Sequence, residues 1–304
     1  MKRLSIIIVT YNSERDIYDC LESIRRHTDI APEELEIIIV DNNSRQADAM
    51  FSEIHHRFGP DIILFRNPRN GGYGQGNNLG IRQASSPVVL IMNPDVRLME
   101  PLFQTVLQAF DADSRLSMYG IKQMLSPGES STNSIACSYS LNGYLATILT
   151  AWANRTDRYL PRLMYFSGSC FFIRKQMFKE IGLFDEELFM YGEEDDIHYR
   201  MKQRYGCHMT YNPHLHYIHL TKERQPDLEY EKRVFRSLSR MLSKKGYSEK
   251  TVTLNHLRRL RLQIWRQRLL TLFGRGNPTL LFMLQDFRKY LNDRYHCQSS
   301  SSPS

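Results

Sequence analysis

The sequence predicts an α/β fold, in which a parallel sheet is flanked by helices and followed by a basic helical extension. Short apolar runs at residues 4–9, 35–40 and 88–92 alternate with helix-like segments, and this rhythm implies parallel strands joined by right-handed crossovers. Each of these runs ends in polar residues. The excess positive charge lies in the last part of the chain, which reads as helical.

Composition limits the class of protein. A chain of 304 residues with 41% apolar and 24% charged residues is typical of a folded protein with one large domain and an appendage, or with two smaller domains. Five cysteines without C-x-x-C spacing argue against a disulfide framework and a zinc site, and favour a reducing cytosol. The apolar run after the basic N-terminus is too short for a signal peptide, and no run is long enough to span a bilayer.

The first elements follow in order. Residues 4–9 form a strand, and residues 14–27 form a helix that Ser13 caps, because one face of that segment is apolar. Residues 35–40 and 62–66 form the next two strands. The members of the apolar helix face are Ile17, Cys20, Leu21 and Ile24.

Residues 88–92 are apolar throughout, as expected for a strand buried on both faces, and run into Asn93, Pro94 and Asp95. These three residues are common in turns, so a plain turn is one interpretation. The carboxyl ends of strands in an open α/β sheet surround the ligand crevice, so a binding site is the other. The other polar strand ends support the site: Thr10, Tyr11 and Asn12, then Asp41, Asn42 and Asn43.

Residues 70–80 hold five glycines among polar residues that include Asn70, Asn77 and Asn78. Glycines permit close approach to a ligand, so the segment predicts a phosphate- or sugar-holding loop at a helix start, with a flexible loop as the alternative. The dinucleotide and P-loop fingerprints are both incomplete here.

Four consecutive acids, residues 193–196, form the second informative stretch. Neighbouring carboxylates raise one another's pKa, so one of them could act as a base. Alternatively, they gather at a helix N-terminus, where the helix dipole favours acids, and Asp196 pairs with Arg200 at i,i+4. Further on, His214, His216 and His219 lie too far apart for a zinc motif.

Residues 222–294 carry 18 Lys or Arg and 7 Asp or Glu, a net charge of +11, which indicates a polyanionic partner, either nucleic acid or anionic lipid. One helix-like segment has leucines alternating with arginines beside Trp265, as in a basic amphipathic helix on an anionic membrane. A helix packed on the protein with a solvated basic face is the alternative. The apolar positions are Leu254, Leu257, Leu260, Ile264 and Leu269, and the arginines are Arg258, Arg259, Arg261, Arg266 and Arg268.

The order strand-Thr-Tyr-Asn, strand-Asp-Asn-Asn-Ser, Asn-x-Gly-x-x-x-Gly-Asn-Asn-x-Gly and Asn-Pro-Asp resembles family 2 glycosyltransferases of the GT-A fold, in particular rhamnosyltransferase-like bacterial enzymes of surface-polysaccharide synthesis. The resemblance implies a mixed sheet that binds a nucleotide sugar. It implies a catalytic domain at residues 1–221, with a nucleotide-sugar half at 1–97 and an acceptor half at 98–221. A basic helical extension at 222–296 and a disordered tail at 297–304 complete the expected organisation.

The resemblance also implies roles for residues. Thr10 and Tyr11 line the base and ribose, Asp41 accepts a hydrogen bond from the pyrimidine ring, and Asn93-Pro94-Asp95 stands where the family carries an Asp-x-Asp metal motif. The expected donor-binding residues are Thr10, Tyr11, Asn12, Asp41, Asn43, Asn70, Gly71, Asn77, Asn78, Asn93 and Asp95.

Asp95 and His219 are the expected ligands of Mg²⁺ or Mn²⁺, with the donor's diphosphate supplying further oxygens. Since Asn93 replaces the first Asp of the motif, metal independence stays open. Glu-Glu-x-Asp-x-x-x-Arg resembles the family motif whose second acid is the base, which places the base at Glu194, or at Asp195 if the role has shifted. The segment around Gly168 and Ser169 resembles the strand that borders the acceptor, although a bulge would explain it equally.

The expected enzyme is an inverting hexosyltransferase that uses a dTDP- or UDP-linked donor and a glycan or polyprenyl-linked acceptor. We expect it in the cytoplasm, in peripheral contact with the anionic inner face of the plasma membrane, and we expect no nucleic-acid partner. A nucleotidyltransferase that makes a sugar nucleotide is the first rival, and it would release pyrophosphate instead of nucleoside diphosphate. A basic nucleic-acid-binding protein is the weaker rival, because the C-terminal region lacks interleaved stacking aromatics.

Overall fold

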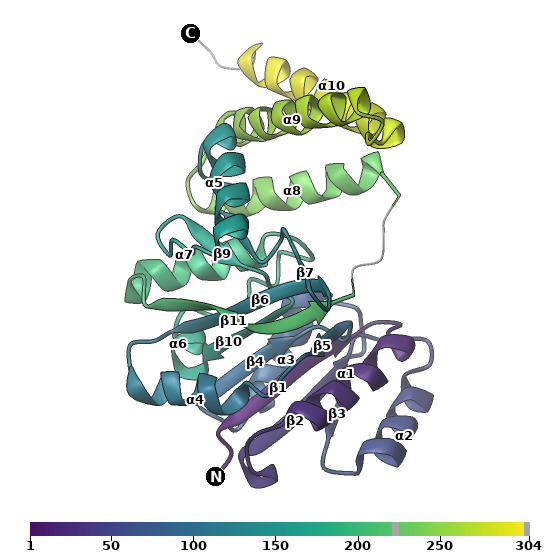
Figure 1. Cartoon of the computed structure of the whole chain (residues 1–304), viewed down its shortest axis with the longest axis vertical. Helices are drawn as coiled ribbons and strands as arrows, with labels where there is room; N and C mark the ends of the chain where they lie inside the picture. The colour runs from purple at the N-terminus through teal and green to yellow at the C-terminus, as the bar shows by residue number, and fades with distance from the viewer. Residues whose placement is uncertain (221–224, 301–304) are drawn as a thin grey trace. The chain divides into compact units, whose positions relative to one another are not determined.

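The computed structural model describes the backbone of residues 1–220 and 225–300 and the side chains of residues 1–220 and 225–296 (Figure 1). The chain divides into two compact units. The first contains Met1–Ile135 and Tyr159–Thr221, and the second contains Ala136–Arg158 and Lys222–Ser304. The domain boundary expected between residues 221 and 222 falls on residues 221–224, which lie outside the described residues.

The first unit is built on a nine-stranded mixed sheet. Four parallel strands form one part of it: β1 (Leu4–Thr10), β2 (Leu35–Asp41), β3 (Ile63–Arg66) and β4 (Val88–Met92). The other strands are β5 (Val96–Leu98), β6 (Met118–Ser126), β7 (Glu129–Ser130), β10 (Cys170–Arg174) and β11 (Met209–His219). The order is β3-β2-β1-β4-β10-β6-β11-β5, with β7 paired to β6. The sheet becomes mixed because β10 runs antiparallel to both β4 and β6.

Helices cover both faces of this sheet (Figure 1). Successive strand residues point to opposite faces, so Ile6 and Ile8 enter one core and Ile7 enters the other. The first core is closed by α1 (Glu14–His27), α2 (Ala47–Phe58) and α4 (Phe103–Ala112). The second is closed by α3 (Gly72–Gln83), α6 (Lys175–Glu180) and α7 (Glu193–Tyr205). The short 3-10 helix Pro32–Glu34 precedes β2, and β9 (Met164–Phe166) precedes β10.

The second unit is helical and uses two separate stretches of the chain. The short strand β8 (Ile135–Cys137) leads into α5 (Gly143–Thr156), which joins three helices from the C-terminal region. Those helices are α8 (Leu228–Lys244), α9 (Glu249–Leu272) and α10 (Pro278–Ser300). The sequence reading did not include the α5 segment in this unit, because residues 136–158 carry neither the charge excess nor an obvious boundary.

Two expectations for the C-terminal region need correction. Leu257, Leu260 and Ile264 of the expected membrane-facing stripe are buried inside the helical unit, where α9 contacts α5, α8 and α10. These three positions therefore pack against other helices and do not face a membrane, whereas Leu269 of the same stripe is exposed. In addition, α10 continues to Ser300, so residues 297–300 are helical where a disordered tail was expected, while residues 301–304 lie outside the described residues.

Candidate active site

The site lies where β1, β2 and β4 end. β1 pairs with β2 and β4 in parallel, so the three carboxyl ends share one edge of the sheet. β10 pairs with β4 in the opposite direction, and Cys170 stands opposite Met92. The loop that enters β10 therefore meets the loop that leaves β4, and the Asn93 amide donates a 2.8 Å hydrogen bond to the Ser169 carbonyl oxygen.

Asp95 and His219 come together through strand register. β5 begins directly after Asp95 and pairs antiparallel with the end of β11, so that Val96 stands opposite His219. The Leu220 amide donates to the Asp95 carbonyl oxygen at 3.0 Å and closes this end of the pairing. As a result, Nε2 of His219 lies 3.2 Å from Oδ1 of Asp95, although the two residues are far apart in the sequence.

The chemistry of this pair fits a divalent cation. Oδ1 of Asp95 is buried and accepts no well-aligned hydrogen bond from any described residue, although Nε2 of His219 lies within ion-pairing distance of it. A cation next to both atoms would satisfy this oxygen. Two neighbouring ligands of an octahedral Mg²⁺ or Mn²⁺ lie about 3 Å apart, close to the separation seen here. Within the described parts of the chain, no three His, Cys, Asp or Glu residues form a group that could hold a metal ion. A cation at this pair would take two ligands from the protein, Asp95 and His219, and its other ligands would be oxygens of a substrate or water.

The other two histidines of this strand have different surroundings. Nδ1 of His216 lies 2.8 Å from Oε1 of Glu100, and the His216 amide donates to the same oxygen. His214 is exposed, and its amide donates to Oδ1 of Asn212. Neither histidine joins Asp95 and His219.

The four acids occupy the first turn of α7. The helix begins after Gly192, whose φ of 102° favours glycine, and the dipole at this end stabilises negative charge. Glu193, Asp195 and Asp196 are buried, whereas Glu194 is partly exposed. Asp196 is engaged by Arg200, whose Nε and terminal nitrogen lie 2.8 Å and 2.6 Å from its Oδ2, in agreement with the expected i,i+4 pair.

Burial changes the acidity of this cluster. It raises the pKa of Glu193 to about 8, with the neighbouring Glu194 carboxylate adding to the shift. Burial also raises the pKa of Glu194, and the charge of Asp195 acts in the same direction. A carboxylate with a raised pKa and partial exposure is suited to accept a proton from a bound hydroxyl group.

Gly168 links the acids to the loop after β4. A Cβ atom at position 168 would lie 2.4 Å from Oε1 of Glu194, so any larger residue there would displace this carboxylate. The Gly168 backbone also hydrogen-bonds to Glu194 and lowers its pKa in part. The Tyr73 hydroxyl donates a 2.6 Å hydrogen bond to the Gly168 carbonyl oxygen. Since Ser169 accepts the hydrogen bond from Asn93, a short chain of contacts joins Glu194 to the segment that carries Asp95.

The sequence did not predict these roles of Tyr73 and Gly168. No pattern singles out Tyr73 except its position among the glycines, and a β-bulge explains Gly168 equally well. A close approach between a glycine and a distant carboxylate depends on how β10 and α7 pack, which no local pattern records.

The residues at the ends of β1 and β2 divide into buried and exposed groups. Asp41 is fully buried and accepts hydrogen bonds from the Thr10 hydroxyl at 3.0 Å and from the amide and hydroxyl of Ser44. It therefore ties the two strand ends together, and its contact with a pyrimidine ring stays a prediction. Tyr11 is 52% exposed, and Asn12 and Asn43, both exposed, adopt left-handed backbone conformations with φ of 50° and 65°. These three residues offer the accessible groups at this edge.

The glycine-rich segment has a packing role. Gly76 and Gly80 of α3 lie where a Cβ would come within 2.7 Å of Val9 and 2.6 Å of Ile7, so their absence of a side chain lets the helix approach β1. Gly72, with φ of 84°, lies against the Phe189 carbonyl oxygen of the loop before α7. Close packing therefore accounts for glycine at these three positions, and a phosphate- or sugar-holding role of the segment stays a prediction.

The asparagines and Gly71 of that segment also have internal surroundings. Oδ1 of Asn70 accepts from the Gly72 amide, and the side chain of Asn78 binds the amide and carbonyl groups of Phe184. A Cβ at Gly71 would meet the Gln75 side chain. Asn77 differs, because its buried Oδ1 accepts no hydrogen bond from the described residues, so Asn77 keeps an unused acceptor. Direct contacts of these residues with a donor stay predictions.

The fold and site define the class of protein. A mixed sheet with parallel strands that end at an Asn-Pro-Asp segment, flanked by helices on both faces, is the GT-A arrangement. The chain belongs to glycosyl transferase family 2, whose model matches residues 5–182. The expected fold class, family and enzyme class are thereby confirmed, whereas the rhamnosyltransferase-like specificity stays a prediction.

Individual relatives and solved structures agree with this membership. The chain is 30% identical over 214 residues to the low-salt glycan biosynthesis hexosyltransferase Agl10 of Haloferax volcanii. The aligned region covers 66% of this chain and 62% of that relative. The chain thus spans less than two thirds of that relative's length. The mannosyltransferase PcManGT of Pyrobaculum calidifontis, solved with GDP-Man and Mn²⁺, has a TM-score of 0.60 at 14% identity over 98% of this chain and 83% of its own. S. aureus TarS residues 1–349 with UDP has a TM-score of 0.54 at 18% identity over 85% of this chain and 70% of its own.

Proposed function

We propose that this protein is an inverting glycosyltransferase, which moves a sugar from a nucleoside-diphosphate donor to a hydroxyl group of a glycan or lipid-linked acceptor. Family membership supports the class of reaction. The observation that carries the proposal at the level of residues is the pairing of Asp95 with His219, which leaves a buried carboxylate oxygen without a hydrogen bond from the described residues. The name of the halophilic relative supports glycan synthesis as the setting.

Donor binding centres on the edge formed by β1, β2 and β4. Asp95 and His219 would hold Mg²⁺ or Mn²⁺, and such a cation, when bound, neutralises charge on the departing diphosphate. The mannosyltransferase with GDP-Man and Mn²⁺ and TarS with UDP support a nucleotide-sugar donor of this kind. We keep a dTDP- or UDP-linked hexose, with rhamnose as one candidate, as the donor to test first.

Glu194 is the proposed base. It is the partly exposed member of the acid cluster, and its raised pKa makes it a better proton acceptor than an ordinary glutamate. Gly168 leaves room for the Glu194 carboxylate, because it has no side chain. The next residue, Ser169, accepts a hydrogen bond from the Asn93 amide, so the loop that contains Gly168 lies next to the segment that leads to Asp95. Asp195 is the alternative base, but it is buried. Attack by the deprotonated hydroxyl on the side of the sugar opposite the diphosphate inverts the anomeric centre.

The proposal is tested with the full chain and a panel of nucleoside-diphosphate sugars, each with EDTA, Mg²⁺ or Mn²⁺. We expect one donor to be turned over, with release of nucleoside diphosphate and with stimulation by a cation that Asp95→Asn abolishes. Asp19→Asn is the matched control, because Asp19 is an exposed aspartate beside Arg97. Release of pyrophosphate would instead identify a nucleotidyltransferase and overturn the proposal.

The search for an acceptor includes polyprenyl-linked glycans, and this choice connects with the expected contact with an anionic membrane in the cytoplasm. No helix within the described residues is long and apolar enough to cross a membrane.

A further inference from the structure

The helical unit exposes a compact set of large apolar side chains around the turn between α9 and α10. Leu272 is 81% exposed, Phe273 72%, Phe282 66% and Trp265 63%, and Leu269 is also exposed. We call these five residues the outer patch. Exposed apolar groups are common singly on protein surfaces, but a cluster of this size within one turn and its flanking helices marks an interaction site.

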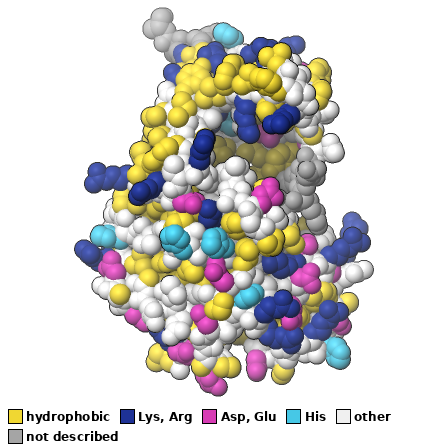
Figure 2. All heavy atoms as spheres, in the orientation of Figure 1, with side chains coloured by type: hydrophobic (Ala, Val, Ile, Leu, Met, Phe, Trp, Pro, Cys, Tyr) yellow, Lys and Arg dark blue, Asp and Glu magenta, His cyan; other side chains and the backbone are white. Residues whose placement is uncertain are grey.

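The outer patch is mixed with arginines on the same side of α9. Arg261, Trp265, Arg268 and Leu272 follow one another at spacings of four, three and four residues, so they share one face of the helix, and all are exposed. This face borders the one that packs in the unit, which carries Leu257, Leu260 and Ile264. Figure 2 shows hydrophobic and basic side chains next to one another on the helical unit.

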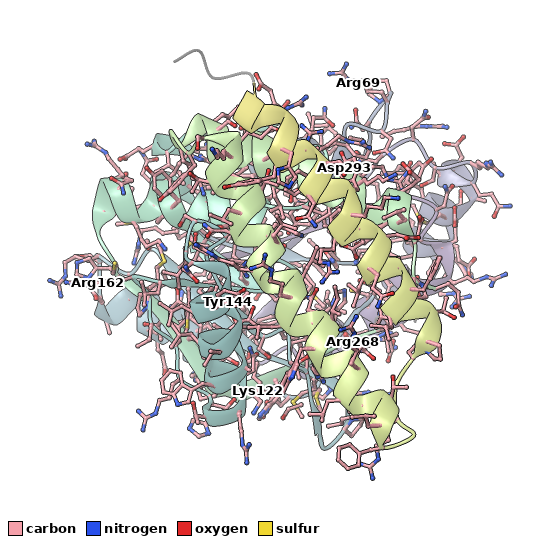
Figure 3. All side chains as sticks on the ribbon, turned by 90° about the horizontal axis from the view of Figure 1, so that it is seen from above. Arg69, Lys122, Tyr144, Arg162, Arg268 and Asp293 are labelled. Carbon is pink, nitrogen blue, oxygen red and sulfur yellow. The ribbon has the colours of Figure 1, made fainter. Side chains whose placement is uncertain are left out.

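The charge around the outer patch is mainly positive, and the nearest acid in the sequence is Asp286, one helical turn after Phe282. Residues 250–285 contain seven Lys or Arg and no Asp or Glu. Arg266, Arg268 and Arg275 form no ion pair with any residue in the described parts of the chain. By contrast, Arg261 donates to the Tyr144 hydroxyl of α5, and Arg259 stacks on Tyr139. Figure 3 labels Arg268 on α9 and Tyr144 on α5. Several arginines beside the outer patch therefore keep their charge available for a partner.

We propose that the outer patch docks on an anionic lipid bilayer, with Leu272, Phe273 and Phe282 entering the boundary between headgroups and acyl chains while the arginines contact lipid phosphates. Exposed Trp, Leu and Phe side chains can enter the interface of a bilayer, and neighbouring arginines are attracted to anionic lipid headgroups. Interfacial tryptophan and snorkelling arginine side chains suit both layers of that boundary.

Two other occupants fit less well. A second copy of this chain would bring two mainly basic surfaces together, and like charges oppose that contact. A nucleic acid would use the arginines and could stack bases on the exposed aromatic side chains, but it would leave Leu269 and Leu272 without an apolar environment. Hydrocarbon is the environment that rewards burial of leucine and phenylalanine together.

The inference deepens the proposed membrane contact but does not depend on sugar transfer, because binding to vesicles is measured without a donor. The full chain is sedimented with vesicles of phosphatidylcholine alone and with vesicles that contain about one third phosphatidylglycerol. We expect binding only to the anionic vesicles. A triple Ser variant, Leu272→Ser/Phe273→Ser/Phe282→Ser, should have a partition coefficient at least about tenfold below that of the wild type. A triple Gln variant, Arg266→Gln/Arg268→Gln/Arg275→Gln, should also bind more weakly, and its difference from the wild type should shrink as salt is added.

The matched control is Ile148→Ser, which removes an equally exposed apolar side chain, 61% exposed, from α5 of the same unit. This variant should bind vesicles as the wild type does. Thermal unfolding and light scattering establish that each variant is folded and report its oligomeric state. If wild-type protein ignores anionic vesicles, or if the triple Ser variant binds them unchanged, the proposal is overturned. A wild-type dimer that the triple Ser variant dissociates would overturn it in favour of self-association.

A second measurement needs no disruptive substitution. The chain has two tryptophans, Trp152 and Trp265, so Trp152→Phe leaves Trp265 as the sole reporter. We expect its emission to shift to shorter wavelength on addition of anionic vesicles and to be quenched by brominated acyl chains. An unchanged spectrum in the presence of bound vesicles would show that this face of α9 does not enter the bilayer, and the proposal would be withdrawn.

Discussion

Replacing Gly168 by alanine tests whether the base is held in place by a glycine. The added Cβ would lie 2.4 Å from Oε1, 2.5 Å from Cγ and 2.8 Å from Cδ of Glu194, whereas ordinary contacts begin at 3.4 Å. The carboxylate must therefore retreat by about 1 Å, a displacement that costs a reacting group about 100-fold in rate. On the activation free energy this corresponds to about 3 kcal/mol.

The assay is steady-state transfer together with calorimetric binding of the donor. We expect Gly168→Ala to lower kcat about 100-fold while the donor Kd stays near the wild-type value, because Glu194 acts on the acceptor. In a Glu194→Gln background the same substitution should cost little more, since both changes act through one group. Gly128→Ala is a control for a glycine-to-alanine change away from Glu194. Nothing lies within 4 Å of a Cβ at that position, and its φ of 85° adds backbone strain, so this variant should lose some stability but keep the wild-type kcat. A Gly168→Ala protein that is folded and turns over at the wild-type rate would refute the assignment of Glu194.

Three further outcomes are expected. Asp95→Asn and His219→Ala should each weaken donor binding at least about tenfold in the presence of Mn²⁺ and little in EDTA, as calorimetry would show; equal losses in both conditions would contradict a cation at this pair. Tyr73→Phe removes the hydrogen bond to the Gly168 carbonyl oxygen and should lower the free energy of unfolding by about 1 kcal/mol. It should also lower kcat by a larger factor than it lowers donor affinity. Unchanged kinetics would limit Tyr73 to a structural role. Glu193→Gln should stabilise the protein increasingly from pH 5 to 8, because the folded protein holds the Glu193 proton up to a pKa of about 8 while the unfolded chain releases it near 4.5. The wild type thus loses about 3 to 4 kcal/mol of stability between pH 5 and pH 8, and the variant does not. Parallel changes in the urea-unfolding free energy of the two proteins across pH would contradict the buried position of Glu193.

Sequence patterns correctly predicted the elements whose formation depends on neighbouring residues in the sequence. The strands at β1, β2 and β4 are continuous apolar runs, and α1 has one apolar face, so burial and periodicity were enough to find them. The acid cluster was also visible, because four adjacent carboxylates are a local feature. The i,i+4 pair of Asp196 and Arg200 followed from helix geometry alone.

Features that depend on long-range packing could not be derived from local patterns. The contact of Asp95 with His219 depends on the register between β5 and β11, and their role as a pair was expected only from the family resemblance. Likewise, a polar residue at a strand end has the same appearance in sequence whether it faces a ligand or the protein. Asp41, at the end of β2, is hydrogen-bonded within the protein. Asn78 of α3 is another predicted donor-binding residue whose side chain hydrogen-bonds within the protein.

The helical unit illustrates a different limit. The sequence predicted one apolar stripe along α9, but a pattern does not specify whether lipid or protein covers such residues. Neighbouring helices cover Leu257, Leu260 and Ile264, whereas Trp265 and Leu269 of the same prediction are exposed and belong to the surface proposed for lipid contact. The contribution of α5 was missed because residues 136–158 are separated from the C-terminal helices in the sequence.

The role of Glu194 is tested most directly by measuring a single turnover of bound donor with Glu194→Gln. A base that acts on the acceptor hydroxyl predicts that this variant binds the donor and cation with wild-type affinity yet transfers no sugar at any pH. Transfer at the wild-type rate, or loss of donor binding by a folded variant, would contradict the account and assign the residue a different role.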